Sequence, residues 1–145
     1  MNDAAILKIA DLFPGHWNRN YTATKLRTDP LYSALAENLR GSDLPLLDLG
    51  CGLGLSAFYL RSKGIGVPIH GLDYDSRKID SARLAATAAG ITDVSFSHHD
   101  ARTGLPEHAG NVSILDILQF FTPGEQQTLL ALAASRVAPG GKLII

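Results

Sequence analysis

Short runs rich in apolar residues alternate with stretches of helical spacing along the last two-thirds of the chain. The runs cover residues 44–49, 68–73 and 94–97, a fourth begins at Asn111, and a fifth covers 142–145. Short apolar runs bounded by turn residues predict buried strands. Strands that alternate with helices predict a parallel sheet with right-handed crossovers. We therefore expect an α/β fold for residues 44–145.

The first third of the chain carries helical patterns only. Apolar positions predict a helix over 3–13, which Pro14-Gly15 should end. A second helix is expected after Asp29-Pro30, with the aspartate as its N-cap and the proline in the first helical position. We expect residues 17–21 to form a loop or an irregular helix start, and residues 1–43 to form a helical cap or lid segment.

Helical spacing also follows three of the predicted strands. The expected helices begin at residue 55, residue 76 and residue 123, and each stops close to a glycine. The third begins with Thr122-Pro123-Gly124-Glu125, which fits a capping box with proline in the first helical position.

The most informative stretch is Leu-Leu-Asp-Leu-Gly-Cys-Gly-Leu-Gly at 46–54. It places Asp48 near the end of a buried strand, directly before Gly50, Gly52 and Gly54. Glycines at that point let the backbone turn sharply and let a ligand approach without Cβ atoms in the way. The helix that follows presents free N–H groups, which favour an anionic group. This stretch predicts a nucleotide-type binding site.

Two nucleotide classes compete for this glycine turn. A dinucleotide fingerprint, Gly-x-Gly-x-x-Gly, would need glycine at position 55, where the chain has leucine. A carboxylate at Asp48 would also repel a pyrophosphate. The pattern Asp-x-Gly-x-Gly-x-Gly instead resembles motif I of the class I S-adenosyl-L-methionine-dependent methyltransferases. The methionine end of that cofactor carries an ammonium, which an acid suits.

The resemblance covers roughly residues 44–145 and implies a three-layer Rossmann-like fold. It also implies cofactor contacts at the strand ends. Asp73 would accept hydrogen bonds from the ribose hydroxyls, Asp100 would pair with the adenine amino group, and the Ala101 N–H would meet a ring nitrogen. Asp116 would contact substrate or cofactor methionine, or else be a buried acid within the fourth strand. The implied cofactor-binding set is Asp48, Gly50, Cys51, Gly52, Gly54, Asp73, Tyr74, Asp100, Ala101 and Asp116.

One further position and one further segment bear on the resemblance. Members of the family often carry histidine where this chain has Gln119, which leaves the role of that position open. The segment Tyr21-x3-Lys25-Leu26-x2-Asp29-Pro30 resembles the lead-in of some bacterial small-molecule methyltransferases.

The sheet of the resembled fold has seven strands, whereas this sequence ends within the fifth. We expect a fold truncated after the fifth strand, either because the chain is a fragment of a longer enzyme or because a partner completes the sheet. In the second case the exposed sheet edge would form a homodimer.

The composition and charge of the chain limit the kinds of binding partner that we expect. The chain has 145 residues, 46% of them hydrophobic, and a formal net charge of −1, without a basic stripe. We therefore expect neither nucleic acid nor a membrane surface as a partner. A lone cysteine, Cys51, indicates a cytoplasmic setting, and no metal-ligand spacing is present.

The expected function is methyl transfer from S-adenosylmethionine to a small-molecule substrate, with no general base identified. Two alternatives remain: a module that binds the cofactor without turnover, and a nicotinamide-dependent oxidoreductase.

Overall fold

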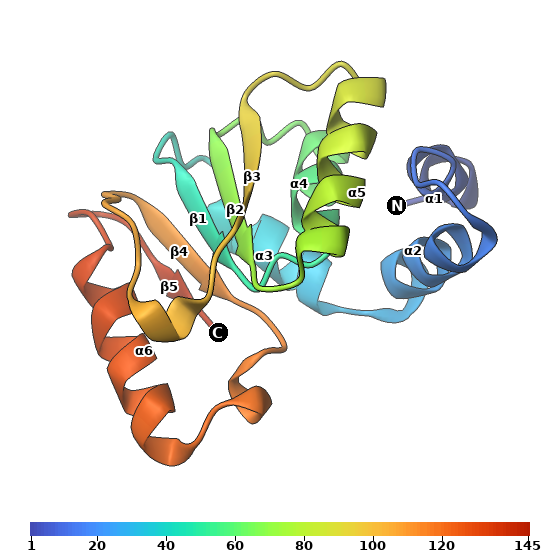
Figure 1. The fold of residues 1–145 in the computed structure, drawn as a ribbon. Helices are drawn as coiled ribbons and strands as arrows, with labels where there is room; N and C mark the ends of the chain where they lie inside the picture. Colours follow the sequence, from blue (N-terminus) through green and yellow to red (C-terminus); the bar gives the residue numbers. More distant parts are fainter.

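The fold is built on one parallel sheet, as the computed structural model of residues 1–145 shows (Figure 1). The spatial order is β3-β2-β1-β4-β5, and every neighbouring pair is parallel. The strands are β1 (Leu46–Leu49), β2 (Ile69–Asp73), β3 (Val94–His98), β4 (Asn111–Ile114) and β5 (Leu143–Ile144). The predicted α/β architecture is confirmed, and each expected apolar run contains a strand.

Helices cover both faces of the sheet and make three layers (Figure 1). One side carries α1 (Asp3–Ala10), α2 (His16–Thr28), α3 (Leu31–Leu39), α4 (Leu55–Ser62) and α5 (Ser76–Ala88), and the other carries α6 (Pro123–Ser135). Side chains alternate across a strand, so β1 feeds both cores. Leu46 packs into the larger core with α1 to α5, whereas Leu47 and Leu49 pack with Leu129 and Ala133 of α6.

The N-terminal segment differs from its prediction in the extent of two helices. Residues 17–21 lie inside the regular helix α2 and form neither a loop nor an irregular helix start, and α1 ends at Ala10 instead of residue 13. Two ion pairs join the helices, Arg19 with Asp11 at 2.6 Å and Arg27 with Asp3 at 2.8 Å. The rings of Trp17 and Tyr21 stack on α2 with centroids 5.2 Å apart.

The segment after β4 also differs from its prediction. The strand ends at Ile114, and a 3-10 turn, η2 (Leu118–Phe120), follows it. Asp116 therefore lies outside the strand, with a left-handed backbone (φ 59°) and an exposed side chain. The alternative of a buried acid within the fourth strand is wrong.

The strand order reverses between β1 and β4, because the chain runs from β1 outward to β3 and then returns to the other side of β1. In open α/β sheets, ligands bind outside the carboxyl ends of the strands at such a switch point. Asp48 lies near the carboxyl end of β1 there, the glycine turn follows that strand, and Asp116 follows β4. None of the helices combines the length and hydropathy that crossing a bilayer requires.

Candidate functional site

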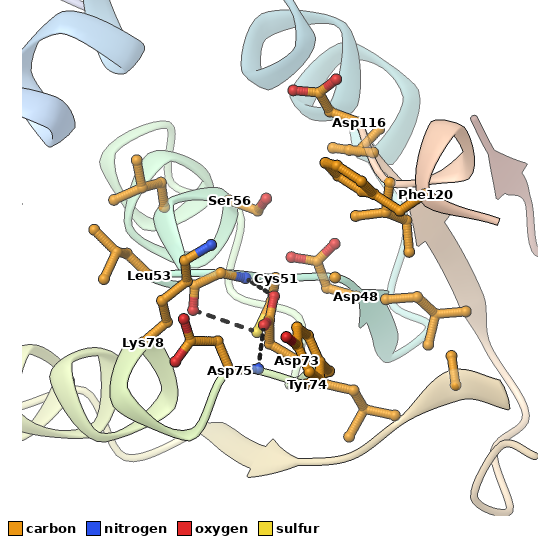
Figure 2. A pocket seen from close by; sticks show the side chains of 18 of the residues that line it. Asp48, Cys51, Leu53, Ser56, Asp73, Tyr74, Asp75, Lys78, Asp116 and Phe120 are labelled. Carbon is orange, nitrogen blue, oxygen red and sulfur yellow. Dashed lines mark hydrogen bonds between the residues drawn. The ribbon is translucent and has the colours of Figure 1, made fainter. Parts of the chain in front are cut away.

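A cavity of about 770 Å³ opens at the carboxyl ends of the strands (Figure 2). The turn after β1, the end of β2, the 3-10 turn η1 (Ala101–Thr103) after β3, the loop after β4, and helices α2 and α3 all contribute to its wall. It brings together nearly all of the predicted cofactor-binding residues. Of the predicted set, only Gly54 is not part of the cavity lining. The lining includes Asp48, Gly50, Cys51, Gly52, Asp73, Tyr74, Asp100, Ala101 and Asp116.

Asp48 is the most deeply buried acid at the cavity. Its carboxylate oxygen Oδ1 accepts a hydrogen bond of 2.6 Å from the Ser113 hydroxyl on β4. The pKa of Asp48 is raised to about 6, mainly by burial and in smaller part by the neighbouring Asp73, while the hydroxyls of Ser113 and Ser56 oppose the rise. The group is therefore ionised at neutral pH, and a cation in the cavity would stabilise its charge.

The three glycines of the turn serve different purposes, although all have positive φ angles of 74°, 56° and 72°. A Cβ atom at Gly50 would collide with the Ile117 side chain, and one at Gly54 would lie 2.5 Å from the Phe96 ring. A Cβ atom at Gly52 would meet nothing within 4 Å. Two glycines are thus required by protein packing, and Gly52 alone borders open space.

Asp73, at the end of β2, organises the same turn. Its Oδ2 accepts a hydrogen bond of 2.8 Å from the Gly52 N–H, and its Oδ1 accepts one of 2.8 Å from the Asp75 N–H (Figure 2). Each carboxylate oxygen has a second lone pair, so Asp73 can still accept a hydroxyl donor from the cavity. Its predicted role toward ribose remains a prediction, as does that of the exposed Tyr74 beside it.

At η1, Asp100 caps the turn by accepting a 3.0 Å hydrogen bond from the Arg102 N–H. The guanidinium of Arg102 lies 4.6 Å from the Phe121 ring centroid and donates to the Phe120 carbonyl at 3.1 Å. Arg102 therefore joins the loop expected to hold adenine to the loop after β4. The adenine contacts of Asp100 and Ala101 remain predictions.

The Cys51 side chain packs against the sheet at the wall of the cavity. A Cβ atom at Gly71 would lie 2.8 Å from the Cys51 sulfur. Burial raises the pKa of the thiol well above its usual value, with Asp48 and Asp73 adding to the rise. The side chain is therefore a protonated packing group.

The structure adds residues of the N-terminal segment to the site. Tyr21, Lys25, Asp29 and Tyr32 line the cavity. The Lys25 ammonium lies 2.7 Å from Asp29 and 3.3 Å from Asp116. The spacing from Tyr21 to Asp29 and the predicted cap or lid over residues 1–43 point to this segment. Neither indicates contact with Asp116, 91 positions beyond Lys25.

The charges at the cavity wall are mostly negative. Six aspartates face three cationic side chains, and two of those cations are already in ion pairs. The aspartates are Asp29, Asp48, Asp73, Asp75, Asp100 and Asp116, and the cations are Lys25, Lys78 and Arg102. The site suits a ligand with cationic groups and hydrogen-bond donors, and disfavours a pyrophosphate.

An open parallel sheet with a glycine turn after β1 and acids at the following strand ends defines a Rossmann-like domain for a nucleoside cofactor. A family model, the methyltransferase domain, matches residues 46–141. The chain belongs to this family, and the expected membership of the class I S-adenosylmethionine-dependent methyltransferases is confirmed.

Curated relatives extend the similarity into the N-terminal segment. The carboxy-S-adenosyl-L-methionine synthase of Colwellia psychrerythraea is 28% identical over 142 residues, which are 95% of this chain and 57% of that protein. The ribosomal protein L11 methyltransferase of Cupriavidus metallidurans is 27% identical over 111 residues, 77% of this chain and 33% of that protein. The chain therefore spans little more than half the length of the first relative.

Solved structures share the fold. TehB from Haemophilus influenzae has a TM-score of 0.67 at 17% identity, covering 86% of this chain and 44% of its own. Magnesium protoporphyrin IX methyltransferase from Synechocystis has a TM-score of 0.65 at 19% identity, and the match covers 86% of this chain and 60% of that protein's chain. These likenesses confirm the Rossmann-like architecture.

Proposed function

We propose that the chain binds S-adenosylmethionine and transfers its methyl group to a small-molecule acceptor. The observation that carries this proposal is the placement of Asp48, Gly52 and Asp73 around one acidic cavity at the switch point of the sheet. Membership of the methyltransferase domain family supports it. The cofactor supplies an activated sulfonium methyl, and the protein supplies binding and orientation.

The proposed cofactor position follows from the charges and donors of the wall. The ionised Asp48 attracts the methionine ammonium, and the open space at Gly52 admits the chain of the ligand. Asp73 accepts from the ribose hydroxyls, and η1 holds the adenine through Asp100 and Ala101. In this arrangement residues at the ends of β3, β2 and β1 would hold the adenine, ribose and methionine parts of the cofactor in turn.

The acceptor end of the cavity is aromatic. Tyr21 on α2 and Phe120 and Phe121 after β4 line this part of the wall. A recessed cavity of this kind encloses a small molecule better than it does a folded protein surface, which supports a small-molecule acceptor over the protein substrate named for the L11 relative.

A ligand panel tests cofactor class. We expect S-adenosylmethionine and S-adenosylhomocysteine to raise the thermal midpoint of the chain, because ligands that bind only the native state stabilise it. NAD and NADP should leave the midpoint unchanged. A rise with NAD alone would replace the proposal with a nicotinamide-dependent oxidoreductase.

A second candidate reaction modifies the cofactor itself. Its support is that relatives named carboxy-S-adenosyl-L-methionine synthase match 95% of this chain, α1 and α2 included. Mass analysis of the products distinguishes the two reactions. Methyl transfer yields S-adenosylhomocysteine and a methylated acceptor. The alternative would replace a proton of the sulfonium methyl group by the carboxyl group of a second, carboxyl-donating substrate, and would yield a heavier sulfonium and no methylated acceptor. Binding without either product would identify a non-catalytic module.

A further inference from the structure

Lys25 lies at the centre of a small charged cluster at the acceptor end of the cavity. It pairs with Asp29 in the same segment and with Asp116 in the loop after β4. Asp116 is held from its other side by Gln119, whose Nε2 donates to the Asp116 carbonyl at 2.9 Å and to its Oδ1 at 3.1 Å. In Figure 2 Asp116 lies beside Phe120, on the far side of Asp48 from Asp73.

Tyr32 shows that several carboxylates share this end of the cavity. The pKa of its hydroxyl is raised first by burial and then by Tyr21 and by the negative charges of Asp29, Asp48 and Asp116. Asp29, Asp48 and Asp116 line the same cavity as Tyr32, and Lys25 is paired with Asp29 and Asp116. With Lys25 in place, this group of side chains retains a net negative charge.

We propose that Lys25 sets the charge at this end of the cavity, and thereby the preference of the site for the sulfonium cofactor over its thioether product. The inference rests on the proposed function. S-adenosylmethionine carries one more positive charge than S-adenosylhomocysteine, so the two ligands differ in how they respond to this charge. Lys25 limits the attraction for the sulfonium and, through its contact with Asp116, acts as a positioning residue.

The proposal predicts opposite effects for the two partners of one ion pair. Lys25→Met makes the cluster more negative and should raise the preference for S-adenosylmethionine. Asp116→Asn makes it less negative and should lower that preference. Asparagine tolerates the left-handed backbone at this position, so the second change preserves the loop. Damage to the fold would instead weaken both ligands together.

Isothermal titration of the full chain with each ligand near neutral pH measures the ratio of the two dissociation constants. We expect Lys25→Met to move the ratio about three- to tenfold toward S-adenosylmethionine and Asp116→Asn to move it by a similar factor the other way, the size expected for one unit charge across a partly hydrated cavity.

Two variants serve as controls. Lys25→Arg keeps the charge and should restore the ratio of the unaltered chain. Arg19→Gln removes a cation from the same helix, where its partner is Asp11 outside the cavity, and should leave the ratio unchanged. Ratios that shift in the same direction, or not at all, in both Lys25→Met and Asp116→Asn overturn the inference while leaving the proposed function standing. Failure of the unaltered chain to bind either ligand overturns both.

Discussion

Replacing Asp48 by asparagine should stabilise the ligand-free protein and weaken cofactor binding at the same time. The side chain is buried, with 2% of the residue exposed, and its pKa is raised to about 6 from the ordinary 3.8. The native state thus holds this proton more tightly than the unfolded chain does. Stability is therefore lost as the pH rises from about 4 through 6, because ionisation is harder in the folded protein.

The size of this loss follows from the two pKa values. Between about pH 4.5 and pH 8 the ionisation of Asp48 should lower the free energy of unfolding by about 2 kcal/mol. Asparagine cannot ionise, and its Oδ1 can still accept the Ser113 hydroxyl hydrogen bond. The stability of Asp48→Asn relative to the unaltered protein should accordingly improve by about 2 kcal/mol over this pH range.

Urea unfolding followed by far-ultraviolet circular dichroism measures the difference at each pH. A constant cost of burying the amide would shift all points equally, so the test is the change with pH rather than any single value. A difference between the two proteins that stays flat from about pH 4.5 to pH 8 would refute the reasoning. As a check on the cause, Ser113→Ala should move the transition to higher pH, because that hydroxyl lowers the Asp48 pKa.

Three further changes test the turn and the last helix. Asp73→Ala should weaken S-adenosylmethionine binding by about 1–3 kcal/mol in calorimetry, and unchanged affinity would remove Asp73 from the site. Gly54→Ala should lower the free energy of unfolding by about 1–3 kcal/mol more than Gly52→Ala, since both are strained at positive φ but only the first meets the Phe96 ring; equal losses in urea unfolding would contradict this. Thr122→Ala should cost about 1 kcal/mol in the same assay by removing a cap, and no loss would show that the capping box contributes little.

The sequence predicted most reliably those features whose causes are local. The capping box at Thr122 and Glu125 is present as expected, because both partners lie within one turn of helix. Asp75 caps α5 through the Arg77 N–H for the same reason. The strand-to-helix turn could also be predicted, since glycine adopts a positive φ more readily than any other residue.

Features that depend on tertiary contact were missed. Residues 17–21 lack a broad apolar face, and α2 buries only Thr22, Ala23 and Leu26, so its helical period is weak. Packing and ion pairs with α1 support the helix instead. The contact between Lys25 and Asp116 depends on how α2 packs against the loop after β4. The spacing of residues along the sequence does not predict this packing.

Because Trp17 stacks on Tyr21, the intrinsic tryptophan fluorescence of the protein can report on ligand binding. The chain contains a single tryptophan, and it stands 70% exposed on α2 against a ring that lines the cavity. Indole emission therefore reports from one known place beside the acceptor end, without a label. A titration that quenches or shifts this emission locates the ligand at α2, whereas one that stabilises the protein with no change in emission locates it nearer β3.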